Sequence, residues 1–278
     1  MFKVATLNTH GLNSRKLTLL LELSQREHLD FICVQESLVS DDYCRETLAR
    51  QWGGPSFWSL AVGRRGGVVI LCSPEQRENV SIWQKDSEGR LLSLLISANG
   101  IKVNLDNLYA PTSPTERGVF FQSLQPYLFP NAHSLLAGDF NCYDGTLVKM
   151  GGSVSIDARL SALKSVHFVT DAWRLKHPKE RQYTWYNSDF SIASRLDSFL
   201  LTRFLCDRVA SCEILPCVYS DHDFVLLNLD LHTAIKWGPG VWKFNNTLLQ
   251  DEDFCASISE LIDSVLLMRS SFPSEIVM

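Results

Sequence analysis

The chain has 278 residues, of which 45% are hydrophobic and 21% charged, the composition of an ordinary soluble globular protein. No apolar run approaches the roughly 20 residues that a membrane helix needs. The N-terminus, MFKVATLN, has neither the basic leader nor the apolar core of a secretion signal. We therefore expect an intracellular protein with no membrane partner and no targeting signal.

The net charge of −5 is unevenly distributed. Residues 250–278 hold six acidic residues and one basic residue, so residues 1–249 are neutral overall. A neutral body argues against tight, sequence-independent binding of DNA, because phosphate neutralisation supplies most of that affinity. It is compatible with brief catalytic engagement.

Strand-like apolar runs recur along the first 231 residues. We expect strands at 2–8, 31–36, 57–62, 67–72, 91–97, 101–109, 133–140, 183–187, 196–202, 210–215 and 224–231. We expect helices at 15–27, 42–51, 115–127 (with Thr115 as its N-cap) and 157–165. Asn99-Gly100 predicts a type I′ hairpin turn, since both residues tolerate positive φ. Hairpins mixed with helical crossovers predict an α/β fold of two mixed sheets packed face to face, with helices outside.

The chain is predicted to have a body, 1–231, and an extension, 232–278. The extension begins as a Gly/Pro-containing stretch and continues as a helix at about 253–268. One apolar stripe runs along that helix: Phe254, Ile258, Leu261, Ile262 and Val265. Either this helix docks on the body, or it is the stump of a longer polypeptide. The eight cysteines form no CxxC pair and predict reduced thiols.

Polar side chains stand at the ends of several apolar runs, where we expect the C-terminal end of a strand or the loop that follows it. They are Asn8, Glu36, Tyr109, Asp139, Asn141, Asp197, Asp221 and His222. Open α/β sheets gather ligand sites at that edge. Carboxylates, amides, a phenol and an imidazole are the chemistry of a metal-assisted phosphoester hydrolase, which needs no Ser or Cys nucleophile.

The residue types suggest separate roles in such a reaction. Mg²⁺ prefers hard oxygen ligands, which Glu36, Asn8 and Asp221 can supply. Asp139 suits the general base that activates water, and Asn141 can hold Asp139 or the phosphate.

A second group of residues can act on the phosphate. His222 can stabilise charge on the phosphoryl oxygens if a carboxylate, best Asp197, keeps it protonated. Tyr109 can donate its hydroxyl to a phosphate oxygen or to the leaving group. Arg195 precedes Leu196-Asp197, and we expect it to contact phosphate. Arg64 and Arg65 either lie near the substrate groove or decorate a hairpin turn.

The series TLN, QE, NLYAP, GDFN, YTW, RLDSFLL and SDH, spread over residues 1–231, is similar to the endonuclease/exonuclease/phosphatase superfamily. Its members are four-layer, DNase I-like α/β sandwiches that cut phosphoesters with Mg²⁺. NLYAP with GDFN, the stretch WRLKHPKERQYTW and SDH resemble the apurinic-type endonuclease domain of LINE non-LTR retrotransposons. The stretch GPGVWKFNNTLLQDEDF resembles the linker to a reverse transcriptase.

The resemblance implies an enzyme that acts in the nucleus. It would use Mg²⁺, or Mn²⁺ in its place, to nick one strand of duplex DNA and leave a 3′-hydroxyl that primes reverse transcription. A reverse transcriptase domain in the full-length element would be a partner. The resemblance implies roles for matching residues: metal binding for Asn8 and Glu36, phosphate contact for Tyr109 and Asn141, water activation for Asp139, and an orienting pair for Asp197 and His222. Thr184 would contact phosphate or orient a neighbour, and Ser220 and Asp221 would flank the pair.

One departure concerns abasic-site repair enzymes, which carry Asp two residues after the first Asn. Here that position is His10, in NTHGL. This weakens the repair interpretation. The alternatives that stay open are an abasic-site endonuclease, an exonuclease III-like 3′ exonuclease, a small-phosphoester phosphatase and an inactive remnant.

Overall fold

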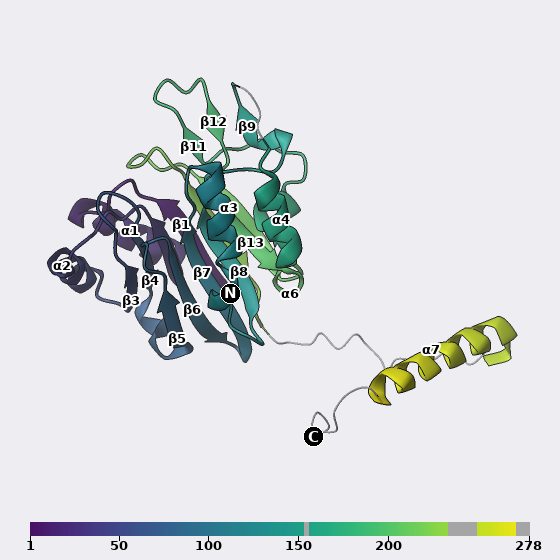
Figure 1. Ribbon diagram of the computed structural model, residues 1–278. Coiled ribbons are helices and arrows are strands. Elements are labelled where there is room, and N and C mark those ends of the chain that lie inside the picture. The colour runs from purple at the N-terminus through teal and green to yellow at the C-terminus, as the bar shows by residue number, and fades with distance from the viewer. Residues whose placement is uncertain (153–155, 233–248, 271–278) are drawn as a thin grey trace. The chain divides into compact units, whose positions relative to one another are not determined.

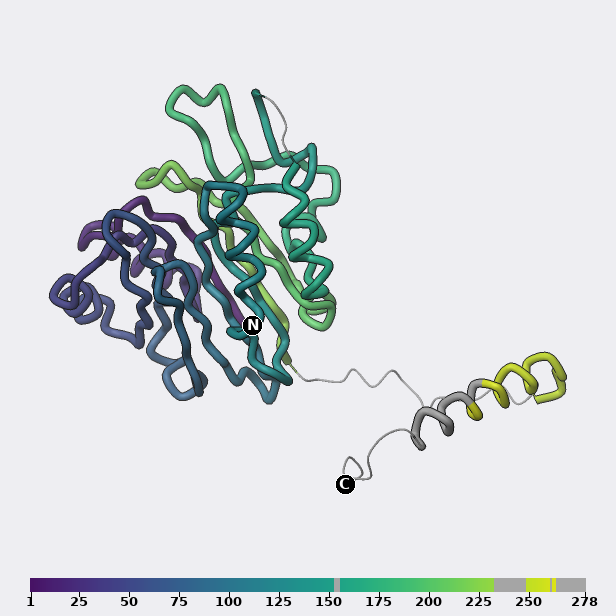
Figure 2. The backbone as a smooth tube through the Cα atoms, viewed as in Figure 1, coloured from purple at the N-terminus to yellow at the C-terminus, as the bar shows by residue number. Residues whose placement is uncertain are grey.

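The structure, a computed structural model, describes residues 1–152, 156–232 and 249–270 (Figures 1 and 2). The chain divides into two compact units, Met1–Thr233 and Ala234–Met278. The first unit contains all the predicted site residues.

Two six-stranded mixed sheets form the centre of the first unit. The first sheet has the order β14 (Val209–Leu215), β15 (Phe224–Leu229), β1 (Phe2–Asn8), β2 (Phe31–Gln35), β4 (Val68–Cys72), β3 (Ser56–Ser59). The second has the order β10 (Val169–Asp171), β13 (Asp197–Thr202), β8 (His133–Asp139), β7 (Ile101–Tyr109), β6 (Leu91–Ala98), β5 (Val80–Lys85). In each sheet one central pair is parallel, β1 with β2 and β7 with β8. A small third sheet joins β11 (Trp185–Tyr186), β12 (Ala193–Ser194) and β9 (Lys149–Met150).

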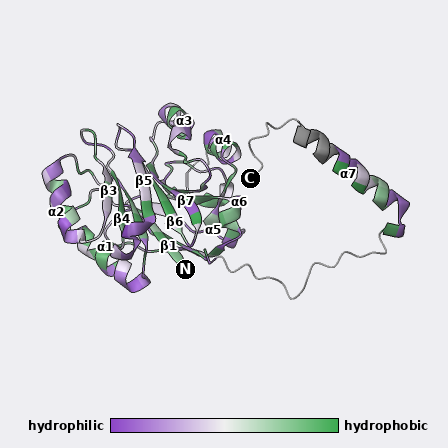
Figure 3. Cartoon of the chain, turned by 90° about the horizontal axis from the view of Figure 1, so that it is seen from below, coloured by the Kyte–Doolittle hydropathy of each residue, from purple (hydrophilic) through white to green (hydrophobic). Residues whose placement is uncertain are grey.

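The packing forms four layers. Strand residues from both large sheets bury one another in the central core, for example Val4 and Phe31 against Leu105 and Phe199. Helices α1 (Ser14–Glu27) and α2 (Asp42–Trp52) cover the outer face of the first sheet. Helices α3 (Pro114–Gln122) and α4 (Ala158–Val166) cover the second. The strands are largely apolar, whereas α1 and α2 mix polar and apolar residues, as a helix with one buried face should (Figure 3). The predicted α/β sandwich is confirmed.

Short elements complete the fold. They are the helices α5 (Ala172–Lys176) and α6 (Arg203–Cys206), and the 3₁₀ turns η1 (Pro74–Asn79), η2 (Gln125–Tyr127) and η3 (Thr146–Val148). The expected hairpin at Asn99-Gly100 is present, with φ of 51° and 78°. The expected N-cap at Thr115 is wrong. Ser113 occupies the N-cap position of α3, without a side-chain capping bond, because Pro114 fits the first helical position with its fixed φ and missing N–H. Strands β5, β9, β10 and β12 were not predicted, because they are short or partly polar.

The second unit contains α7 (Glu252–Ser270). Ile258 and Ile262 on this helix are 39% and 53% exposed. The side chains of Leu261 and Val265, and residues 233–248 of the predicted linker, lie outside the described residues. In the described parts of the chain, no helix is both long and apolar enough to span a bilayer.

Strand directions bring the polar residues to one edge of the sandwich. The parallel pairs place the carboxyl ends of β1, β2, β7 and β8 together, and these ends carry or precede Asn8, Glu36, Tyr109 and Asp139. Asp197 differs from expectation because it begins its strand. β13 runs antiparallel to β8, so Asp197 lies opposite Asp139. His222 reaches the same edge because the loop between β14 and β15 leads into a strand antiparallel to β1.

Candidate active site

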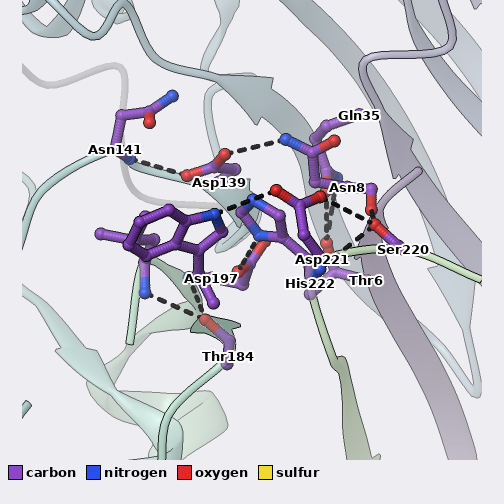
Figure 4. A network of polar contacts seen from close by, with 12 residues as sticks. Thr6, Asn8, Gln35, Asp139, Asn141, Thr184, Asp197, Ser220, Asp221 and His222 are labelled. Carbon is purple, nitrogen blue, oxygen red and sulfur yellow. Dashed lines mark hydrogen bonds and ion pairs between the residues drawn. The ribbon is translucent and has the colours of Figure 1, made fainter. Parts of the chain in front are cut away.

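The centre of the site is a buried cluster of Asp139, Asp197 and His222 (Figure 4). Their side chains are 1%, 0% and 6% exposed, and one oxygen or nitrogen of each lies within 4.8 Å of the others. His222 Nδ1 lies 2.8 Å from Asp197 Oδ2. Because that contact occupies Nδ1, the other ring nitrogen is the atom that can meet a substrate.

Both oxygens of Asp139 accept hydrogen bonds. The backbone N–H of Asn141 donates to Oδ1 at 2.8 Å, and the Asn8 amide donates to Oδ2 at 3.0 Å (Figure 4). Asn141 adopts a positive φ of 50°, which asparagine tolerates better than most residues. Its own amide donates to the Ala110 carbonyl at 2.8 Å. Asn141 therefore holds Asp139 through its backbone, and Asn8 reaches the same carboxylate from the other sheet.

Thr184 fixes the backbone that carries Asp197. Its side chain is fully buried, and its hydroxyl oxygen accepts the N–H groups of Leu196 and Asp197 at 3.0 and 3.1 Å. Of the two roles that the resemblance implied for Thr184, the geometry matches orientation of a neighbour. Among the described residues, Asp197 Oδ1 has no hydrogen-bond partner, so much of the charge of this carboxylate acts on the imidazole of His222.

Charges in the cluster shift the pKa of its members. Burial alone would lower the pKa of His222, but the carboxylates of Asp197, Asp139 and Asp221 raise it to about 10. Burial, aided by the charge of Asp197, raises the pKa of Asp139 to about 7, against the opposing effect of His222 and the two donors on its carboxylate. The cluster thus combines an imidazole whose charged form is favoured with a carboxyl group whose pKa lies near neutral pH, the condition for an efficient general base.

The loop before β15 adds a third carboxylate, that of Asp221. Trp185 Nε1 donates to Asp221 Oδ2 at 3.0 Å, and His10 Nδ1 lies 3.5 Å from Asp221 Oδ1. The Ser220 hydroxyl donates to the backbone carbonyl of Asn8 at 2.7 Å, which fastens this loop to the end of β1. Although partial burial opposes it, the positive charge of His222 and the bond from Trp185 hold the pKa of Asp221 below its usual value.

Glu36 and Tyr109 form the other part of the site. The Tyr109 hydroxyl donates to a carboxylate oxygen of Glu36, joining the loop after β2 to the end of β7. Beneath them Gln35 Nε2 donates to Asn107 Oδ1 at 2.6 Å, and the Asn107 amide donates to the carbonyls of Val34 and Val69. This buried bridge ties the two sheets together one or two residues before the side chains that act at the surface.

Arg195 does not reach the site surface, and the expectation that it contacts phosphate is wrong. Its side chain is 4% exposed and pairs with Asp171 at 2.7 Å. Its guanidinium also lies 5.0 Å from the centre of the Trp173 ring. A buried guanidinium that already has a carboxylate partner stabilises the fold beneath the site and is not available to a substrate.

Three of the predicted positions offer hard oxygen donors that suit a divalent cation. The Glu36 carboxylate is partly exposed, and only its bond from Tyr109 occupies it among the described residues. The side-chain amide oxygen of Asn8, Oδ1, accepts the backbone N–H of His10 at 3.0 Å and keeps a second lone pair. Asp221 lies beside His10, which also lines a pocket with Glu36. This oxygen-rich donor set fits Mg²⁺ or Mn²⁺ better than a softer metal.

Several residues that support the site were not predicted from the sequence. Trp185 was expected in the core, yet its indole N–H holds Asp221. Gln35 and Asn107 were not singled out, although each is a fully buried amide next to a predicted site residue. A buried polar side chain adjoining a strand-end carboxylate is the signal that could have found them.

Comparison with known proteins agrees with this geometry. Residues 5–222 match the model of the Endonuclease/Exonuclease/phosphatase family. The chain therefore belongs to that family, and the predicted superfamily of metal-dependent phosphoester hydrolases is confirmed.

A 149 kDa protein of the transposon TX1 from Xenopus laevis is 29% identical over 268 residues. The match takes in 92% of this chain but only 20% of the transposon protein. Two solved structures share the fold: the AP endonuclease LMAP from Leishmania major, at 17% identity and a TM-score of 0.70, covering 81% of this chain and 86% of its own, and the 3′ phosphatase NExo from Neisseria bound to a product DNA hairpin, at 18% identity and a TM-score of 0.69, covering 83% of this chain and 100% of its own.

Proposed function

We propose that the chain is a divalent-metal-dependent DNA endonuclease of retrotransposon type. It nicks one strand of a duplex in the nucleus and leaves a 3′-hydroxyl for target-primed reverse transcription by a reverse transcriptase of the full-length element. The observation that carries this proposal is the buried cluster of Asp139, Asp197 and His222, in which His222 Nδ1 lies 2.8 Å from Asp197 Oδ2. The similarity to a transposon protein supports the biological setting.

In the proposed reaction, water attacks phosphorus and the bond from phosphorus to the 3′-oxygen breaks. Asp139, which Asn8 and Asn141 hold in place, accepts the proton of the attacking water. His222, kept protonated by Asp197, donates a hydrogen bond to a phosphoryl oxygen as negative charge builds there. The leaving 3′-oxygen takes a proton from solvent water, and Asp139 returns its proton to solvent. The products are a 3′-hydroxyl on one fragment and a 5′-phosphate on the other.

The cation would be held by the Glu36 carboxylate and the side-chain amide oxygen of Asn8, with Asp221 beside them. When bound, it supplies positive charge that stabilises the phosphoryl group and the leaving oxygen. Tyr109 fixes the orientation of the Glu36 carboxylate through its hydrogen bond. Asn8 therefore links the two chemical tasks, because its nitrogen holds Asp139 while its oxygen faces the metal side.

A plasmid assay tests this function. Supercoiled plasmid incubated with the protein and Mg²⁺ should become nicked circles, and EDTA should abolish the reaction. A DNA polymerase should extend the nicks directly, as only a free 3′-hydroxyl permits. If no Mg²⁺ or Mn²⁺ concentration gives nicks, the proposal is wrong. Cleavage confined to a duplex with an abasic site would instead assign the chain to repair.

A further inference from the structure

A basic pocket lies beside Glu36, apart from the buried cluster. It encloses about 310 Å³, and its lining includes Arg64, Arg65 and Arg90 together with Glu36 and Tyr109. Asp139, Asp197 and His222 are not part of its lining. The pocket therefore adjoins the metal side of the proposed site and carries charge of the opposite sign to that of Glu36.

Three chain segments meet tightly to form this pocket. The Ser37 N–H donates to the Gly67 carbonyl at 2.8 Å, and the Gly67 N–H donates to the Gly89 carbonyl at 2.8 Å. Gly67 has a φ of +82°, and a Cβ on it would lie 2.3 Å from Ser37 Oγ, so no other residue fits without movement. The loop bearing Arg64 and Arg65 is thus fastened to the segment that follows Glu36.

Arg90 is fixed by contacts with Tyr109. Its guanidinium carbon lies 5.1 Å from the centre of the Tyr109 ring, and its Nη1 donates to the Tyr109 carbonyl at 3.2 Å. The Asp86 carboxylate accepts the backbone N–H of Arg90 at 3.0 Å and so holds the turn before it. The Arg90 guanidinium is therefore positioned by Tyr109, the same residue whose hydroxyl orients Glu36.

The charges of these arginines are not neutralised by partners. Within residues 1–152, 156–232 and 249–270, no carboxylate lies within 4.0 Å of the guanidinium nitrogens of Arg64, Arg65 or Arg90. By contrast, Arg117 pairs with Asp157 at 2.5 Å and is buried. Glu116 also lines the pocket but makes no such pair. Guanidinium groups around a hollow, without acidic partners, are suited to bind phosphate.

We propose that Arg64, Arg65 and Arg90 bind the DNA-backbone phosphate next to the one that is cleaved, on the Glu36 side. The proposal rests on the proposed function. If the cleaved phosphate of a DNA strand lies between Glu36 and His222, the next phosphate of that strand lies beside this pocket. It also gives a body without net positive charge a means of engaging DNA, because three guanidinium groups lie together in a pocket beside Glu36. Phosphate contacts of this kind set position and register and do not read sequence.

The salt dependence of DNA binding tests this subsite. The variant R64Q/R65Q is compared with wild type and with R26Q/R77Q, which removes the same charge from two exposed arginines. Arg26 lies in the last turn of α1, shortly before β2 begins, and Arg77 follows the end of β4. Both therefore lie at the opposite edge of the first sheet. A fluorescein-labelled duplex in EDTA is titrated at several salt concentrations, nicking of plasmid in Mg²⁺ is measured in parallel, and thermal unfolding confirms that each variant is folded.

The slope of log affinity against log salt should fall by about 1 in magnitude for each phosphate contact that R64Q/R65Q loses. The slope of R26Q/R77Q should equal that of wild type, and only R64Q/R65Q should show a raised KM for nicking. If wild type nicks DNA but R64Q/R65Q matches R26Q/R77Q in slope and KM, the subsite is overturned and the function stands. If wild type fails to nick with either Mg²⁺ or Mn²⁺, the function fails and the subsite fails with it.

Discussion

The two halves of the active-site edge carry their charges in different ways. In the first half, Asp139, Asp197 and His222 are buried; His222 and Asp197 lie at hydrogen-bonding distance, and one oxygen of Asp139 lies within 4.8 Å of both. In the second half, Glu36 lies in a pocket whose arginines are exposed or half-exposed and have no carboxylate partner among the described residues. In the first half, each charged side chain already has a hydrogen-bond partner within the protein. In the second half, Glu36 and the arginines would gain ionic partners on binding a metal cation and a phosphate anion.

This difference separates chemistry from binding. A buried cluster whose side chains are held by hydrogen bonds within the protein is preorganised for proton transfer. The open half can exchange its ligands, because its charges are solvated in the free protein and cost less to rearrange. Substitutions in the first half should therefore reduce the rate of the chemical step, and those in the second should change the concentrations of metal and DNA that the reaction needs.

The largest effect is expected for Asp139→Ala, which removes the base from the first half. Nicking should slow by at least about 10²–10⁴, the usual contribution of a positioned acid or base. The half-saturating Mg²⁺ concentration should change little, since the proposed ligands remain. Asp207→Ala is a suitable control, because Asp207 is exposed and follows β13 at the far edge. A slowing of less than tenfold in Asp139→Ala would remove this residue from its assigned role.

Glu36→Gln should have the next largest effect and should act on metal binding. The amide keeps the size of the side chain but loses the charge that attracts the cation. The half-saturating Mg²⁺ concentration for nicking should rise by at least about 10-fold, as is usual when groups around a metal are altered, and added Mg²⁺ should restore part of the rate. An unchanged Mg²⁺ titration would show that Glu36 does not hold the metal and would break the distinction between the two halves.

The sequence predicted most of the strand-end side chains because chain position alone decides which residues follow a buried strand. Asn8, Glu36, Tyr109 and Asp139 needed only a correct reading of β1, β2, β7 and β8. The prediction that Arg195 contacts phosphate failed, because its place two residues before Asp197 does not reveal that it pairs with Asp171 on another strand. The contact between Gln35 and Asn107 spans 72 positions, and it depends on how one sheet packs on the other. Local pattern indicates which edge a residue reaches, but three-dimensional packing determines its partner.

Asp197→Asn should sharpen the comparison through pH dependence. The Asp197 charge raises the pKa values of both His222 and Asp139, so its loss should lower both. The rate should rise with pH as Asp139 ionises and fall as His222 loses its proton. Both limbs of the profile of kcat/KM should therefore move to lower pH than the wild-type limbs near 7 and 10. An alkaline limb that stays in place would mean that Asp197 does not keep His222 protonated.

The smallest effect on activity is expected for Asn107→Ala, which cuts the bridge beneath the two halves. The Asn107 amide donates to the carbonyls of Val34 and Val69 and accepts from Gln35, and all these groups are buried. Leaving them without partners should lower the free energy of unfolding by about 1–3 kcal/mol in urea denaturation. Asn228→Ala is the matched control, because the Asn228 amide makes one bond, to Ser211 at 2.7 Å, on a half-buried strand position. Since the bridge lies below Glu36 and Tyr109, Asn107→Ala should raise the Mg²⁺ requirement slightly and leave the pH profile set by Asp139 and His222 in place. A shift of that profile without a change in the Mg²⁺ requirement would show that the bridge supports the buried half instead.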